Sequence, residues 1–193
     1  MSKHKTILDA EYALSRKIAL AYIVKQPIKP WLQAIPGMFI IDFLARTKEI
    51  RKYSQYYMYF RKLAMDLAMA NINGHHMDDF LSQKQDKITE WLEMQKINHP
   101  NVTQAYVSLV DRLVKHYELM LKATEDKYQA MIEEAYQTWD EYNRFLSELS
   151  SLEQEVDQAI EELSDEEMHQ YYTRLTKHME ADEQRKKELE EIF

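Results

Sequence analysis

NVTQAYVSLVDRLVKHYELMLKATEDKYQAMIEEAYQTWDEYNRFLSELSSLEQEVDQAIEEL, residues 101–163, contains no glycine and no proline. Apolar side chains recur through it at three- and four-residue steps, beginning with Tyr106 and Val110 and ending with Ile160 and Leu163. This spacing puts the apolar side chains on one helical face, and its average is about 3.5 residues, the coiled-coil period. Thr124 is the polar exception. The stretch therefore predicts long amphipathic helices.

The length of this patterned stretch limits how it can fold. An uninterrupted helix over residues 102–163 would be ~93 Å long at ~1.5 Å per residue, which exceeds a compact domain of this size. We therefore expect either a break or a projecting arm. Capping-box patterns begin at Ser150 and at Ser164, where a serine precedes a glutamate by three residues. We favour Ser164, because acidic residues then fill the first turn of a following helix, about residues 165–191.

The whole chain of 193 residues has only two glycines and four prolines. Folds rich in strands need tight turns, and tight turns need residues that tolerate positive φ. Further helices are predicted at about 6–25, 36–71 and 78–97, and Gly74 is placed to end the second of them in a left-handed conformation. The predicted fold is all-α, an elongated helical bundle of about five to six helices with long coiled-coil-like helices.

Charge is distributed unevenly along the chain. Residues 1–65 have a balance of +8, residues 66–122 of −2 and residues 123–193 of −14, which gives a net charge of −8. We interpret residues 1–100 as a basic, aromatic-rich helical part and residues 101–193 as an acidic antiparallel helical hairpin, joined in one continuous structural unit. The basic and acidic ends could pair with each other or each serve a different partner.

Residues 31–62, WLQAIPGMFIIDFLARTKEIRKYSQYYMYFRK, change from apolar to basic and tyrosine-rich. One interpretation is the central helix of the bundle, with residues 38–45 surrounded by other helices. The other is a surface for a protein partner or for lipid, where cations meet anionic headgroups at about 1 kcal/mol each. Asp42 weakens the lipid interpretation. The candidate surface residues are Trp31, Phe39, Arg46, Lys48, Arg51, Lys52, Tyr56, Arg61 and Lys62.

Motifs for metal binding or catalysis are sparse. Glu166 and His169 form one Glu-x-x-His pair, half of the ferritin-like motif, and are the weak metal candidates, although the pattern favours a helix-start acid and a surface histidine. The absence of cysteine excludes disulfides, thiolate metal sites and a cysteine nucleophile. No glycine-rich phosphate loop is present. We expect no cofactor and favour a non-catalytic protein, while an active site assembled from distant residues stays open.

The function predicted from these patterns is a non-catalytic helical interaction or scaffold protein, which presents long amphipathic helices to a protein partner or to another copy of itself. The first alternative is a peripheral membrane-surface protein using residues 31–62, and the second is a helical-bundle enzyme or ligand carrier. Nucleic acid is disfavoured, because the acidic last 71 residues would repel a polyanion.

The expected location is the cytoplasm, at the inner face of a membrane if the lipid alternative holds. Residues 1–25 contain charges that interrupt any signal-peptide core, and no run reaches the ~18 apolar residues of a spanning helix.

Overall fold

The computed structural model describes residues 2–25, 38–74, 77–95 and 97–163, with five positions near the C-terminus, Arg185, Lys187, Glu188, Glu190 and Ile192. Over these ranges the chain forms six α-helices and no strand, so the all-α prediction is confirmed. The helices are α1 (Lys3–Lys25), α3 (Met38–Ile72), α4 (Met77–Met94), α5 (Pro100–Lys122), α6 (Tyr128–Tyr136) and α7 (Trp139–Glu161).

The first three helices lie close to their predicted bounds. The glycine signal is also confirmed: Gly74 has φ +75° and follows the last turn of α3, where the Asn73 amide donates to the Met69 carbonyl. Positive φ is costly for any residue with a Cβ, which explains why glycine stands at this point.

The patterned stretch 101–163 is broken, as expected, at two places that the sequence analysis does not name. It folds as α5, α6 and α7, with breaks over residues 123–127 and 137–138, so a single long coiled-coil-like helix is not confirmed. Ser150 lies inside α7, and the prediction of a break there is wrong. Ser164, the favoured position, lies outside the described residues.

Two threonines and one strained residue mark the actual breaks. Thr138 is the N-cap of α7, and its side-chain oxygen accepts from the Glu141 amide at 3.3 Å, which is the threonine half of the capping-box pattern. Gln137 before it has φ 58°, in the left-handed region. At the other break, the Thr124 amide and hydroxyl donate to Glu134 at 2.7 and 2.9 Å, and these hydrogen bonds lower the pKa of that carboxyl.

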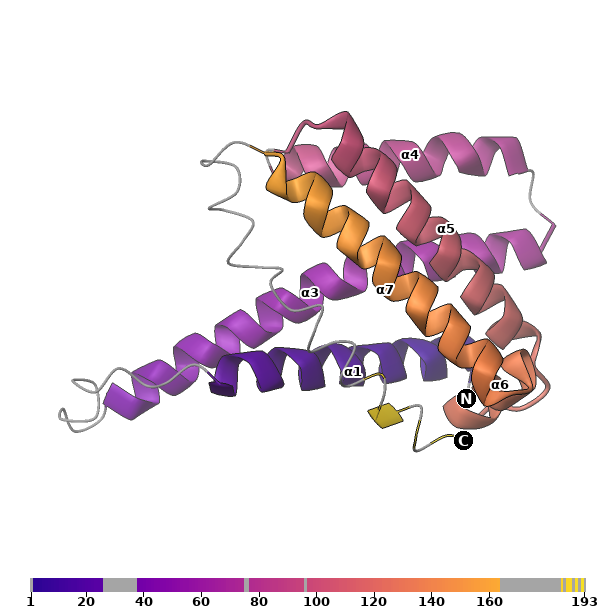
Figure 1. The fold of residues 1–193 in the computed structure, drawn as a ribbon, viewed down its shortest axis with the longest axis horizontal. Helices are drawn as coiled ribbons and strands as arrows, with labels where there is room; N and C mark the ends of the chain where they lie inside the picture. Colours follow the sequence, from indigo (N-terminus) through magenta and orange to yellow (C-terminus); the bar gives the residue numbers. More distant parts are fainter. Residues whose placement is uncertain are drawn as a thin grey trace.

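Helices α3, α4 and α5 alternate in direction: in Figure 1, α3 runs from left to right, α4 returns from right to left along the top, and α5 runs down to the right. Tyr56 reaches Gln95 while Tyr59 reaches Lys87, so α4 is antiparallel to α3. Helix α5 returns parallel to α3, since the Phe60 ring stacks on Tyr106 and the Asn71 amide donates to Glu118 further along both helices.

Helix α7 runs antiparallel to α5. Asn101 of α5 donates to Glu162 beyond the end of α7, and Arg112 pairs with Glu148. All six helices contribute to one continuous hydrophobic core. Its aromatic centre is Phe60, whose ring lies 4.7 Å from Trp91 and 4.1 Å from Tyr106 between centroids. Burying each such side chain contributes about 2 kcal/mol or more of hydrophobic stabilisation.

Helix α1 packs antiparallel against α3, and the two form an arm. Residues 12–25 of α1 and 38–56 of α3 make up this arm, whose end lies beyond the ends of α4, α5 and α7 (left in Figure 1). It has a small core of its own, formed by Leu14, Ile18, Ala19 and Tyr53 with Ile50 and Tyr57 packed against it. Among the described residues, no helix combines the length and the apolar character needed to cross a bilayer.

Candidate functional site

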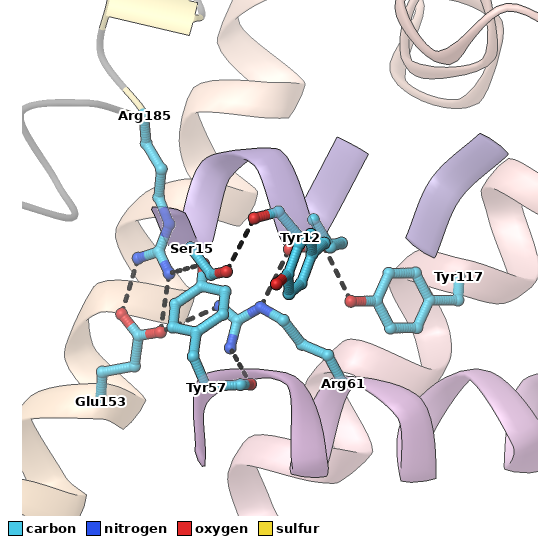
Figure 2. A network of polar contacts seen from close by, with 8 residues as sticks. Tyr12, Ser15, Tyr57, Arg61, Tyr117, Glu153 and Arg185 are labelled. Carbon is cyan, nitrogen blue, oxygen red and sulfur yellow. Dashed lines mark hydrogen bonds and ion pairs between the residues drawn. The ribbon is translucent and has the colours of Figure 1, made fainter. Parts of the chain in front are cut away.

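Four charged side chains are buried together at the root of the arm (Figure 2). They are Glu11 of α1, Arg61 of α3, Glu153 of α7 and Arg185 near the C-terminus, and each is at most 5% exposed. Two carboxylates oppose two guanidinium groups, so the charges cancel. Buried ions are tolerated only when they are paired and hydrogen-bonded in this way. We call these four residues the buried charge cluster.

The cluster is connected as a chain from α1 to the C-terminal segment. Arg61 donates from Nε to Glu11 Oε2 at 3.0 Å and from a terminal nitrogen to Glu153 Oε1 at 3.3 Å. Arg185 donates to both oxygens of Glu153, at 2.6 and 2.7 Å. This two-point contact is the strong geometry for an arginine–carboxylate pair, and it fixes the position of Arg185.

Two tyrosines also contact the buried charge cluster. The Tyr117 hydroxyl donates to Glu11 Oε1 at 2.8 Å, and the Arg61 guanidinium lies 3.5 Å above the centre of the Tyr57 ring. Burial raises the pKa of Tyr117, and the neighbouring Glu11 raises it further. Burial likewise raises the pKa of Tyr57, against the lowering effect of Arg61 and Arg185. Both hydroxyls therefore stay protonated at physiological pH.

The two guanidinium groups stay charged. Burial acts to lower the pKa of Arg61, but Tyr57, Glu11, Tyr117 and Glu153 together raise it above its ordinary value. Burial acts in the same direction on the pKa of Arg185, and Glu153 outweighs it. A general acid or base needs a pKa near the working pH, and neither arginine nor either tyrosine has one. The geometry thus favours a structural role for the cluster, which fastens α1, α3, α7 and the C-terminal segment to one another.

His116 lies next to the cluster and is neutral. Its Nδ1 is 2.6 Å from the Tyr136 hydroxyl, and its ring stacks on Phe145 with centroids 4.2 Å apart. Burial, followed by the charges of Arg112, Arg61 and Arg185, lowers the pKa of His116 to about 3. The cavity between His116 and the cluster measures about 20 Å³. That is room for about one water molecule and not for an organic substrate.

The structure separates the cations predicted to lie on one surface. Arg61 is buried in the charge cluster, so it does not belong to an exposed surface, and this corrects the expectation for it. Tyr56 is half-buried between α3 and α4, where it donates to Gln95 and meets the Trp91 ring edge-on. Lys48, Arg51 and Lys62 are exposed.

Arg46 is partly exposed, and it lies on the arm with Lys48 and Arg51. The antiparallel partner helix adds Arg16 and Lys17, which are also exposed. The predictions for Trp31, Glu166 and His169, and for the side chains of Phe39 and Lys52, fall outside what the structure describes. Among the residues that are described, no three histidine or acidic side chains converge as metal ligands would.

Sequence reasoning missed Glu11, Glu153, Arg185 and His116, although a signal for two of them exists. Glu153 falls between Leu149 and Val156 on the apolar stripe of α7, and His116 falls between Leu113 and Met120 on that of α5. A charged or polar residue at a stripe position faces the core and needs a buried partner there. Only the tertiary structure shows which partner that is.

No family model, no curated protein and no solved structure matches this chain.

Proposed function

We propose that this chain is a non-catalytic helical interaction protein whose α1–α3 arm docks on a partner. The observation that carries the proposal is the position of the arm: a two-helix element with an exposed basic surface extends from a bundle whose own buried charges are compensated. A docking element needs an accessible surface and a fixed root, and the arm has both.

The charge of the arm differs from that of everything else in the chain. Its two segments, residues 12–25 and 38–56, hold seven Lys/Arg and two Asp/Glu, a balance of +5. The remainder therefore carries −13. Such a division gives the molecule one end that attracts an acidic partner, while the other end repels it, and so orients the encounter.

The buried charge cluster supports the proposal mechanically. Glu11 and Arg61, one on each helix of the arm, pair at its root, and Glu153 and Arg185 hold that pair to the rest of the bundle. A docking surface whose root is held in this way loses less conformational freedom on binding than a flexible one would.

Photo-crosslinking in the producing cells tests the proposal. A photoreactive residue in place of exposed Lys48 should give adducts, because Lys48 lies on the docking surface. The same residue in place of Gln104, exposed on α5, is the matched control and should give few. Mass spectrometry of the adducts identifies the partner, protein or lipid. Equal labelling at both positions, or none at Lys48, would refute docking through the arm.

A further inference from the structure

The geometry points to an anionic lipid bilayer as the partner of the arm. This inference rests on the proposed function and adds to it the chemistry of the partner. It is carried by three features of the described residues: exposed cations on both helices of the arm, an exposed leucine among them, and an acidic surface on the rest of the bundle.

The cations come from both helices of the arm. Arg16 and Lys17 on α1 and Lys48 and Arg51 on α3 are all exposed. By sequence, the acidic residues of the arm are Asp42 and Glu49, both on α3. Each exposed Lys or Arg near an anionic membrane strengthens binding roughly fivefold, and the attraction decays within a Debye length. Four such side chains on one element therefore give useful, salt-dependent binding.

An apolar component accompanies this charge. Leu20, one turn beyond Arg16 and Lys17, is 43% exposed. Residues 38–45, the first turns of α3 toward the end of the arm, read MFIIDFLA and hold a single charged residue. Elements that lie in the headgroup region combine cations with apolar residues in this manner, and they do so without the length of a spanning helix.

A second copy of the chain suits the arm less well. Helix α7 exposes Glu148, Glu155 and Glu161, which could attract the arm of another molecule. Its only exposed large apolar side chain among those described is Trp139, so it offers little to cover Leu20. The same acidic surface would be repelled by an anionic membrane, which leaves the arm as the part that faces the bilayer.

Vesicle co-sedimentation with the full chain tests the inference. We expect binding to vesicles of phosphatidylcholine with phosphatidylserine, weaker binding as salt rises, and little binding to phosphatidylcholine alone. The double variant Lys48→Glu with Arg51→Glu should weaken binding at least twenty-fold, since two attractions of about fivefold each are lost and repulsion is added. The matched control is Lys115→Glu with Lys122→Glu, two exposed cations of α5, which should bind as the parent does.

A second experiment tests whether the arm is the part of the molecule that faces the membrane. The chain has no cysteine, so Leu20→Cys accepts a single polarity-sensitive dye, and Gln104→Cys is the control. Only the dye at position 20 should become blue-shifted with anionic vesicles. No binding at low salt, or equal loss in both charge variants, would overturn the lipid inference. Concentration-dependent self-association that depends on Lys48 and Arg51, without vesicle binding, would instead identify a second copy. None of these results refutes docking through the arm as such, which the crosslinks at Lys48 test separately.

Discussion

At the scale of single residues, His116 makes stability depend on pH. Its pKa falls from 6.5 to about 3 on folding, mainly because burial disfavours the charged ring. Between those pH values the unfolded chain binds a proton that the folded chain does not. The free energy of unfolding therefore falls as pH drops below about 6.5, by about 1.4 kcal/mol per pH unit from this residue alone.

Replacing His116 isolates this contribution. His116→Gln removes the titration and keeps a group that can hydrogen-bond Tyr136. Between about pH 7.5 and about pH 5.5, urea unfolding should show the parent losing about 1 kcal/mol more than the variant. The other six histidines are common to both proteins and cancel in the comparison. Parallel stability curves would mean that His116 is accessible to protons in the folded state.

At the scale of the element, the end of α6 is strained. Gln137 adopts φ 58°, and its amide donates to the Glu133 carbonyl at 2.8 Å to close the helix. Glycine tolerates this region without a Cβ clash, so Gln137→Gly should raise the free energy of unfolding by about 1 kcal/mol, less the entropy it adds to the unfolded chain.

The same replacement in a regular helix provides the control for α6. Gln154, exposed within α7, has no such strain, and Gln154→Gly should lower the free energy of unfolding by about 1 kcal/mol. Urea denaturation of both variants measures the two effects, and their opposite signs are the expected result. Two losses of similar size would show that position 137 gains nothing from glycine.

The helices themselves were largely predictable, because apolar periodicity and the scarcity of glycine and proline are local signals. The break before α7 is also encoded locally, since Thr138 caps the first turn of α7 and is followed three residues later by Glu141, as in the capping-box pattern. The break at Thr124 depends on the Glu134 side chain ten residues away. The polar Thr124 within the apolar pattern indicates this break only weakly. Signals of this second kind become readable only when the partner is known.

At the scale of the whole molecule, sequence reasoning could not place Arg61. Lys48, Arg51 and Arg61 follow one another along a single helix, and the same residue type serves opposite purposes there. Arg51 is in solvent, while Arg61 meets a glutamate 50 residues earlier and another 92 residues later. Pairing between residues so far apart in the sequence follows from how the helices pack. The pattern of charges along the chain does not reveal it.

The buried charge cluster determines how the distant parts of the chain are held together, and a double-mutant cycle on its strongest pair tests this. Arg185→Met removes the two-point contact with Glu153 and leaves that carboxylate buried, so it should lower the free energy of unfolding by about 3 kcal/mol. Adding Glu153→Met removes the stranded charge and should recover much of that loss, because two apolar side chains then fill the space. The exposed Lys115→Met is the control and should change stability by less than about 0.5 kcal/mol. The single variant Glu153→Met completes the cycle, and urea unfolding measures all five proteins, the parent included. If the double variant lost as much stability as the two single variants together, Glu153 and Arg185 would act independently. The C-terminal segment would then not be held to α7 by their charges.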